Sequence, residues 1–530
     1  VIYVGANDGM LHAFRARDGV EKWAFVPPFI ASSMPLMVNA NLNRGGAGGS
    51  NAIYGVDGSP VVHDMYFQSP LGRTGAKAWH TIMFVPYGRG GAGFSALDIT
   101  NPDRPLHLYS VLNDIVLHKV HVMNHLGVLS SYDYIATSYS LSSFTEAVNA
   151  TDNAQDASIT SWTCDSTGNT QCFKSRTWTF PVRGVSKADL TITKDGSNYT
   201  NFQVGTLNGD TIITFGDDIT YYGGDPGNAS LASTSLGVSI KPGSSTTGVI
   251  TQPEYDYSKL GETWSAPRIF RLPNIGAGDT NIEDDIYVAA MGGGYGTQFE
   301  GVGSALFLIN IENGRIHKVI DIEDMISNDI VNSVPGTPVV ITADTARGIE
   351  FKGAMVYTND FEGKITKFNL TNMSDDGDSN AIALYDNTTL FNSGSTKSNG
   401  RYMYHSMDAT IGQKTNSLWL YSGTGDYERL TTSSNAISNL LLGINDPHYP
   451  LYKEVKTPAL ADDLTDCKNT TNDTSGASCP EAGDRGWYIT LNDSKKVTAE
   501  PTVSGGLVYF PIYKPSSSVN KCSLGDAFIC

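Results

Sequence analysis

Short apolar runs that alternate with polar residues recur along the chain, separated by Gly, Asn and Asp turns. The first copy, residues 1–14, contains IYVGANDGMLHAF, which predicts a strand, an Asn-Asp-Gly turn and a second strand, with a third strand at 20–25. Further copies start near Val56, Trp264, Gly336, Ala409 and Arg485. Alternation with a period of two is typical of half-buried strands. The pattern therefore predicts an all-β protein.

Each copy has room for about three or four strands. A sheet of that size cannot bury both faces alone and must stack on neighbouring sheets, so a repeated unit of this kind indicates a β-propeller. The widest gap between copies, residues 112–260, is itself strand-like at 190–216. A structureless connection of that length would be unusual in a compact domain. We therefore expect first propeller blades at 1–111, an inserted β-rich subdomain or long loops at 112–260, and the remaining blades at 261–530.

The charge balance narrows the possible partners. The chain has 36 basic and 54 acidic residues, a formal net charge of −18, which argues against nucleic acid as a partner. No apolar run reaches the roughly 18 residues that a membrane-spanning helix needs. The chain opens at Val1 inside an expected strand, without a Met or a leader. We expect it to start partway through a longer precursor.

The six cysteines fall into three close pairs. Local pairs within polar loops favour sequential disulfides, although six cysteines allow 15 connectivities. Disulfides imply export to an oxidising space. The expected pairs are Cys164 with Cys172, Cys467 with Cys479, and Cys522 with Cys530.

Two motifs have a plain structural interpretation. Residues 88–93 match the spacing GxGxxG, but FSALDIT follows, which predicts a strand where a dinucleotide-binding fold would need a helix. We interpret this segment as a wide hairpin. His118, His121 and His125 have helical spacing, which predicts a short helix with surface histidines, with metal binding as the alternative.

One acidic segment is a candidate calcium site. Asp279, Asn281, Glu283 and Asp285 place oxygen ligands at alternate positions, as a calcium-binding loop does. The segment lacks the glycine and the terminal glutamate of an EF-hand. A solvated acidic hairpin is the alternative.

Residues 13–23 have the skeleton A-x-x-A-x-x-G-x-x-x-W. In quinoprotein propellers this skeleton docks the Trp of one blade against the next blade. We therefore expect Trp23 to have a packing role. The vicinal cysteines of quinoprotein dehydrogenases do not occur in this sequence.

Several ordered motifs together resemble the PilC/PilY family of type IV pilus tip-associated adhesins and assembly factors. The resemblance spans most of the chain except 112–260. It is carried by YVGANDGMLHAF, VDGSPVVHDMYF, GGAGFSALDITNPDRP, GETWSAPRI, MGGGYG, VYTNDFEGKITKFNL, YSGTGDY and RGWYITL.

The resemblance implies a modified, roughly seven-bladed, quinoprotein-like propeller, with an N-terminal adhesive domain outside this chain. It implies a non-enzymatic protein, exported through the periplasm to the cell surface or pilus tip. There it would bind minor pilins and a host or abiotic surface ligand, and help balance pilus extension and retraction. The family's calcium loop falls at residues 344–353. Only Asp344 and Glu350 remain there as ligands. Calcium is therefore the one cofactor that we expect, and this loop keeps an incomplete set of ligands for it.

Two other functions remain open from the sequence. The Trp skeleton would also suit a quinoprotein-like dehydrogenase, and the repeated blades would suit a carbohydrate-binding propeller. A bound quinone would favour the first, and glycan binding without pilus association would favour the second.

Overall fold

The computed structural model describes most of the chain outside the central segment. The described residues are 1–38, 53–69, 77–134, 254–272, 286–296, 301–323, 330–342, 353–371, 385, 387–412, 417–452, 464–467, 485–516 and 525–530, together with residue 200 and the strands named below between 145 and 240. They form two compact units: residues 1–134, 254–319 and 330–530 in the first, and residues 135–253 and 320–329 in the second.

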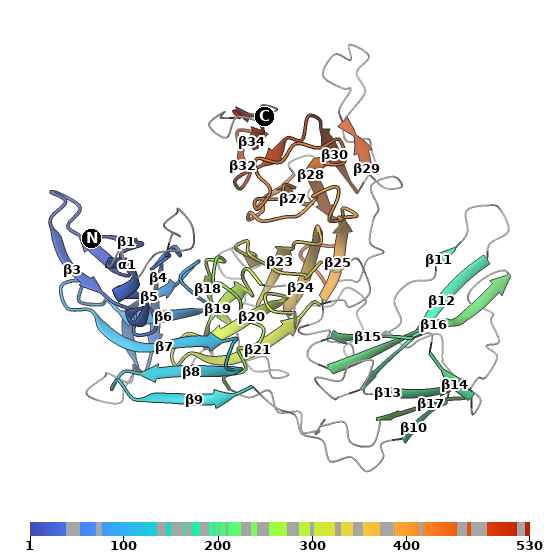
Figure 1. The fold of residues 1–530 in the computed structure, drawn as a ribbon, viewed down its shortest axis with the longest axis horizontal. Helices are drawn as coiled ribbons and strands as arrows, with labels where there is room; N and C mark the ends of the chain where they lie inside the picture. The colour runs from blue at the N-terminus through green and yellow to red at the C-terminus, as the bar shows by residue number, and fades with distance from the viewer. Residues whose placement is uncertain are drawn as a thin grey trace. The chain divides into compact units, whose positions relative to one another are not determined.

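The first unit is a series of antiparallel sheets (Figure 1). The first three contain β1 (Ile2–Gly5), β2 (Leu11–Phe14) and β3 (Glu21–Phe25); β4 (Val61–Phe67), β5 (Ala78–Pro86), β6 (Gly93–Asp98), β7 (Leu106–Asp114), β8 (Lys119–Asn124) and β9 (Leu129–Asp133); and β18 (Arg268–Leu272), β19 (Ile286–Gly292), β20 (Ala305–Asn310) and β21 (Arg315–Asp321). The next contain β22 (Val339–Thr342), β23 (Gly353–Asn359), β24 (Lys364–Thr371) and β25 (Asn387–Asn392); and β26 (Asp408–Ile411), β27 (Leu418–Gly423), β28 (Asn439–Asp446), β30 (Gly486–Leu491) and β29 (Leu464–Asp466). The C-terminal sheets contain β31 (Lys496–Val497), β34 (Pro511–Lys514) and β35 (Asp526–Ile529); and β32 (Thr502–Ser504) with β33 (Leu507–Tyr509).

Consecutive strands are hydrogen-bonded neighbours in most of these sheets, as in the blades of a propeller. The all-β prediction is confirmed, since the helical elements among the described residues are the short η1 (Ala31–Ser33) and α1 (Met34–Val38). No helix in this part of the chain is long and apolar enough to cross a membrane. The number of blades stays a prediction.

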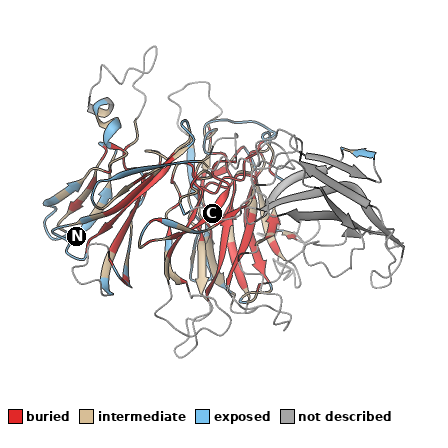
Figure 2. Ribbon diagram, turned by 90° about the horizontal axis from the view of Figure 1, so that it is seen from below, coloured by how far each residue is buried: buried red, intermediate tan, exposed pale blue. Residues whose placement is uncertain are grey.

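The core of the first unit lies between neighbouring sheets. Every residue of β23 is buried, and so is every residue of β20 except the last (Figure 2). A strand covered on both faces reads as a continuous apolar run, which explains ALFLIN and GAMVY. One core cluster joins β4–β8 with β19–β21, and another joins β23–β25 with β27–β29. Within each cluster, neighbouring sheets therefore stabilise one another.

The second unit contains two four-stranded sheets. The strands are β10 (Thr145–Asn149), β17 (Ser235–Ile240), β13 (Leu190–Lys194) and β14 (Ser197–Tyr199), and β11 (Thr163–Cys164), β12 (Gln171–Phe180), β16 (Asp210–Gly223) and β15 (Phe202–Leu207).

The boundary of this unit differs from the expected start at 112, because residues 106–133 form β7, β8 and β9 of the first unit. The chain leaves the first unit after Tyr134 and returns at Glu254. Contacts within the first unit join these two points of the chain. The rings of Tyr132 and Tyr255 stack with their centres 5.0 Å apart. Asn113 accepts a hydrogen bond from the Tyr134 hydroxyl, and its amide donates to the Leu260 carbonyl at 2.7 Å.

The helix expected at His118–His125 is wrong. His118 has φ +52° in a turn, and His121 lies on strand β8 with its Nδ1 2.8 Å from the Ser131 hydroxyl. Paired strands on both sides satisfy the backbone of β8, so sheet formation overrides the helical spacing.

The outcome differs among the three predicted cysteine pairs. Cys164 and Cys172 face each other in the register of β11 and β12, and Cys467 is disulfide-bonded. Cys530 is a free, exposed thiol, so the predicted Cys522–Cys530 disulfide is wrong. The β34–β35 hairpin carries Cys530 to the strand end beside Phe510, where the two residues exchange backbone hydrogen bonds. Cys479 and Cys522 lie outside the described residues.

Candidate ligand pocket

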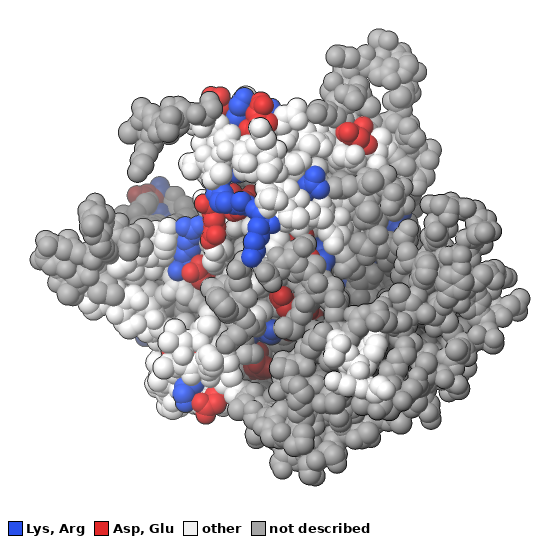
Figure 3. Space-filling model, turned by 45° about the vertical axis from the view of Figure 1, so that its right-hand side comes forward, with Lys and Arg blue, Asp and Glu red and all other residues white. Residues whose placement is uncertain are grey.

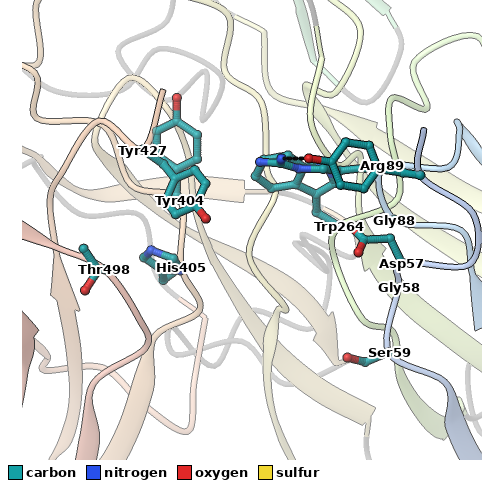
Figure 4. Close-up of a pocket in the computed structure, with 11 residues that line it drawn as sticks. Asp57, Gly58, Ser59, Gly88, Arg89, Trp264, Tyr404, His405, Tyr427 and Thr498 are labelled. Carbon is teal, nitrogen blue, oxygen red and sulfur yellow. Dashed lines mark hydrogen bonds between the residues drawn. The ribbon is translucent and has the colours of Figure 1, made fainter. Parts of the chain in front are cut away.

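A pocket of about 500 Å³ opens where several sheets of the first unit end (Figure 4). Its walls come from two repeated positions. One is the hairpin between the second and third strands of a sheet, which supplies Gly88 and Arg89 before β6 and Tyr427 before β28. The other is the segment before the first strand of a sheet, which supplies Asp57–Ser59, Trp264 and Tyr404. The repeat therefore places corresponding residues of different sheets around one space.

The hairpin at residues 88–93 is held tightly against the segment before β4. Gly88 has φ +60°, which favours glycine, and β6 begins at Gly93, so the hairpin interpretation of this motif is confirmed. A Cβ on Gly90 would lie 1.8 Å from the Gly55 carbonyl oxygen. This close backbone approach brings Arg89 next to Tyr54.

Thr263 fastens the same hairpin to the segment before β18. Its hydroxyl oxygen accepts hydrogen bonds from the amides of Tyr87 at 2.9 Å and Gly88 at 3.2 Å, and it donates to the Gly93 carbonyl at 2.7 Å. The next residue is Trp264, so this contact fixes the indole ring beside Arg89.

The Arg89 guanidinium lies among three aromatic rings. Its central carbon is 4.7 Å from the ring centre of Trp264, 5.0 Å from that of Tyr54 and 5.8 Å from that of Tyr427. Its Nη1 donates to the Tyr54 hydroxyl at 2.8 Å, drawn as a dashed line in Figure 4. Cation–π contacts of this kind stabilise the position of the cation without neutralising it.

The opposite side of the pocket carries His405, Tyr404 and Thr498 (Figure 4). Burial lowers the pKa of His405 to about 4, so its imidazole is neutral at physiological pH. Its Nε2 is buried without a hydrogen-bond partner among the described residues. An unpartnered buried polar atom beside a cavity can bind a ligand.

An acidic and aromatic group flanks the pocket. Trp264 stacks on Tyr295 at 4.9 Å, and its Nε1 donates to Glu262 at 3.0 Å. Tyr295 donates to Glu428, and burial raises the pKa of Glu262. These contacts fix the position of the indole ring. On the face drawn in Figure 3, basic and acidic side chains of the described residues lie close to one another.

A buried polar cluster supports the neighbouring hairpin between β23 and β24. The Asn332 amide donates to Asp360 at 3.1 Å and to Glu362 at 2.9 Å, and Glu362 pairs with Lys364 at 2.5 Å. Burial raises the pKa of Asp360 to about 7. This cluster positions the hairpin, since its groups contact one another.

The structure does not describe the calcium candidates. Asp279, Asn281, Glu283 and Asp285 are outside the described residues, and so are Asp344 and Glu350 of the family loop. Within the described part of the chain, no three His, Cys, Asp or Glu side chains come together as metal ligands would. Calcium binding stays a prediction.

Trp23 has the predicted packing role. It lies on β3, and its Nε1 donates to the Pro102 carbonyl at 2.9 Å in the connection between β6 and β7 of the next sheet. Lys22 pairs with Asp103 beside it. The Trp of one sheet therefore docks on its neighbour, as the skeleton predicted.

The sequence reasoning missed the pocket residues themselves. Arg89 stands inside the GxGxxG segment, and Trp264 and Tyr427 stand inside GETWSAPRI and YSGTGDY, which were read only as blade motifs. The available signal was positional, because all three occupy the hairpin or pre-strand position of a repeat.

The fold and the family comparison together define the class as an all-β protein of the β-propeller type. A family model described as the PilY1 beta-propeller domain matches residues 1–128. Over this segment the chain is similar to the PilY1 family.

Curated relatives each match about a fifth of the chain. The type IV pilus biogenesis factor PilY1 of Pseudomonas aeruginosa (strain UCBPP-PA14) is 39% identical over 102 residues, which is 19% of this chain and 8% of that protein. A PilY1 homolog of Xylella fastidiosa is 43% identical over 103 residues, covering 19% and 7%. The aligned segment thus spans less than a tenth of these relatives. The crystal structure of the P. aeruginosa PilY1 C-terminal domain aligns over 97% of this chain and 76% of that one, at 16% identity and a TM-score of 0.48.

Proposed function

We propose that this chain is the propeller part of a type IV pilus biogenesis protein. The observation that carries the proposal is the identity of 39–43% to proteins named as PilY1 biogenesis factors or their homologs. Sheets that share cores with their neighbours make a rigid support on which hairpins and insertions can bind partners. The proposal includes a non-enzymatic role at the cell surface or the pilus tip.

The finer role is contact with minor pilins and a surface ligand, with an effect on the balance between pilus extension and retraction. The formal net charge of −18 supports docking on a basic patch of a partner. Such docking should weaken with salt, because exposed charges are screened beyond about 8 Å at physiological ionic strength.

Deletion of the encoding gene tests the biogenesis role. We expect loss of surface pili and of twitching motility, restored by the wild-type gene. Affinity purification of the tagged protein should recover minor pilins at low salt and fewer of them at high salt. Normal piliation and adhesion in the deletion strain, with no pilin recovered, would contradict the proposal.

A further inference from the structure

Arg89 lies beside the pocket with no described carboxylate within ion-pair distance, unlike several other described arginines. Arg15, Arg315 and Arg429 each pair with an Asp or Glu side chain. Among the described residues Arg89 contacts the Tyr54 hydroxyl and three aromatic rings, and no carboxylate lies within ion-pair distance. The carboxylates of Asp57 and Glu262 act on Arg89 only at longer range, so its N–H groups remain available to hydrogen-bond an anion.

The ring contacts also orient the guanidinium. The aromatic faces fix its plane, whereas the N–H groups point outward from its edge and only one of the five donates to Tyr54. A carboxylate binds such an edge through two parallel hydrogen bonds. Of the ionic groups a ligand could carry, this geometry favours a planar carboxylate.

The other residues that line the pocket indicate which class of molecule would bear the carboxylate. The pocket has no aliphatic lining residue among those described; its side chains are aromatic rings, hydroxyls, an imidazole and the carboxylate of Asp57. The C–H face of a pyranose packs on the negative faces of aromatic rings such as Tyr404 and Tyr427. Its hydroxyls can bond to Asp57 and to Thr498. A volume of about 500 Å³ is within the usual range for a small-molecule site.

We propose that this pocket binds a pyranose that bears a carboxylate, with Arg89 on the carboxylate and the aromatic residues on the sugar face. Uronic and sialic acids share this chemistry. A peptide is disfavoured because its apolar side chains would find no aliphatic contact in the wall. The inference deepens the adhesive part of the proposed function, and it concerns binding by the purified chain, so it can fail while the biogenesis role stands.

Calorimetric titration of the whole 530-residue chain tests the site. The probes are trigalacturonate, sialyllactose, the methyl ester of trigalacturonate and neutral lactose. We expect at least one acidic sugar to bind, and which of the two binds identifies the source. The ester and lactose should bind about tenfold or more weakly, because they lose the charge-assisted pair.

Variants assign the binding to Arg89. Arg89→Lys keeps the charge but loses the planar fork, and we expect affinity to fall about tenfold or more. Arg17→Gln removes an arginine whose side chain is 75% exposed, and it should leave affinity within about twofold. Trp264→Phe keeps an aromatic face and should have a smaller effect than Arg89→Lys. Circular dichroism and thermal unfolding verify that each variant is folded.

Three results would overturn the inference. The first is no binding of either acidic sugar at 10 mM, a concentration on the order of a very weak site. The second is equal binding of the acid and its methyl ester. The third is tighter binding of an acidic hexapeptide than of either sugar, which would assign the pocket to a peptide ligand.

Discussion

The side chains of Lys367 and Asp446 form an ion pair with no exposure to solvent. Lys367 Nζ is 2.7 Å from Asp446 Oδ2, and both side chains have 0% exposure. The pair is further satisfied, since the Tyr357 hydroxyl donates to Asp446 at 2.8 Å and Lys367 donates to the Leu451 carbonyl at 2.8 Å. A buried pair with complete hydrogen bonding joins β24 to β28 and the segment that follows it.

Lys367→Met should destabilise the first unit by about 3–5 kcal/mol, because it leaves the Asp446 carboxylate buried without its countercharge. Urea unfolding followed by circular dichroism measures the change. Lys514→Met is the matched control, because Lys514 pairs with the exposed Asp493 and its loss should change stability little. Similar midpoints for the two variants would contradict this account of the buried pair.

The alternation of apolar and polar residues in the sequence does not predict this ion pair. In GKITKFNL the two lysines, Lys364 and Lys367, are three positions apart, so alternation places them on opposite faces of the strand and does not single out Lys367 as buried. β24 is an inner strand of its sheet, so Lys367 is buried and its partner lies 79 positions along the chain by number. The local alternation of apolar and polar residues cannot identify a partner so distant in the sequence.

At the level of the elements, the contact between the first two sheets depends on few groups. The Trp23 indole donates to Pro102, and Trp23 and Phe25 pack beside the cluster that contains Leu11 and Met83. This contact links two sheets whose strands are not hydrogen-bonded to each other.

Trp23→Phe should reduce the free energy of unfolding by about 1 kcal/mol for the lost hydrogen bond, with a further loss from the smaller ring. Thermal unfolding measured by circular dichroism would show a lower midpoint. Trp79→Phe provides the comparison, since Trp79 is 65% exposed and should have a smaller effect. If the two variants unfold alike, Trp23 does not hold the sheets together.

Much of the element order could be predicted from the sequence, because Gly and Asn-Asp-Gly turns separate alternating runs. The hairpin before β6 and the docking of Trp23 both follow from such local signals. The histidines at 118–125 show the limit: their spacing fits a helix, yet pairing with β7 and β9 makes the segment a strand. The pocket needs three or more sheets to meet, so its residues are adjacent only after folding.

At the scale of the whole first unit, two buried groups should make the free energy of unfolding depend on pH in opposite directions. Burial raises the pKa of Asp360 from 3.8 to about 7, so its contribution is fully present below about 4 and is lost as pH rises through about 7. Burial lowers the pKa of His405 from 6.5 to about 4, so its contribution is present above 6.5 and is lost as pH falls toward 4.

Urea unfolding of wild type, Asp360→Asn and His405→Gln between pH 4 and 8 separates the two effects. The advantage of wild type over Asp360→Asn should shrink as pH rises from 4 to 7. The advantage of wild type over His405→Gln should shrink as pH falls from 6.5 to 4. Parallel curves for all three proteins would show that neither group titrates as its burial implies.

The contacts that join the two points where the chain leaves and re-enters the first unit allow the segment between them to vary in length. Tyr132 stacks on Tyr255, and Asn113 bonds both to Tyr134 and to Leu260, so the first unit itself joins the points where the chain departs and returns. Once those ends are fixed, closing the intervening loop costs free energy that grows only with the logarithm of its length. Relatives could therefore carry segments of very different size at this point while keeping the same sheets. The tyrosine stack and Asn113 mark a place where new binding domains can be acquired without redesign of the propeller.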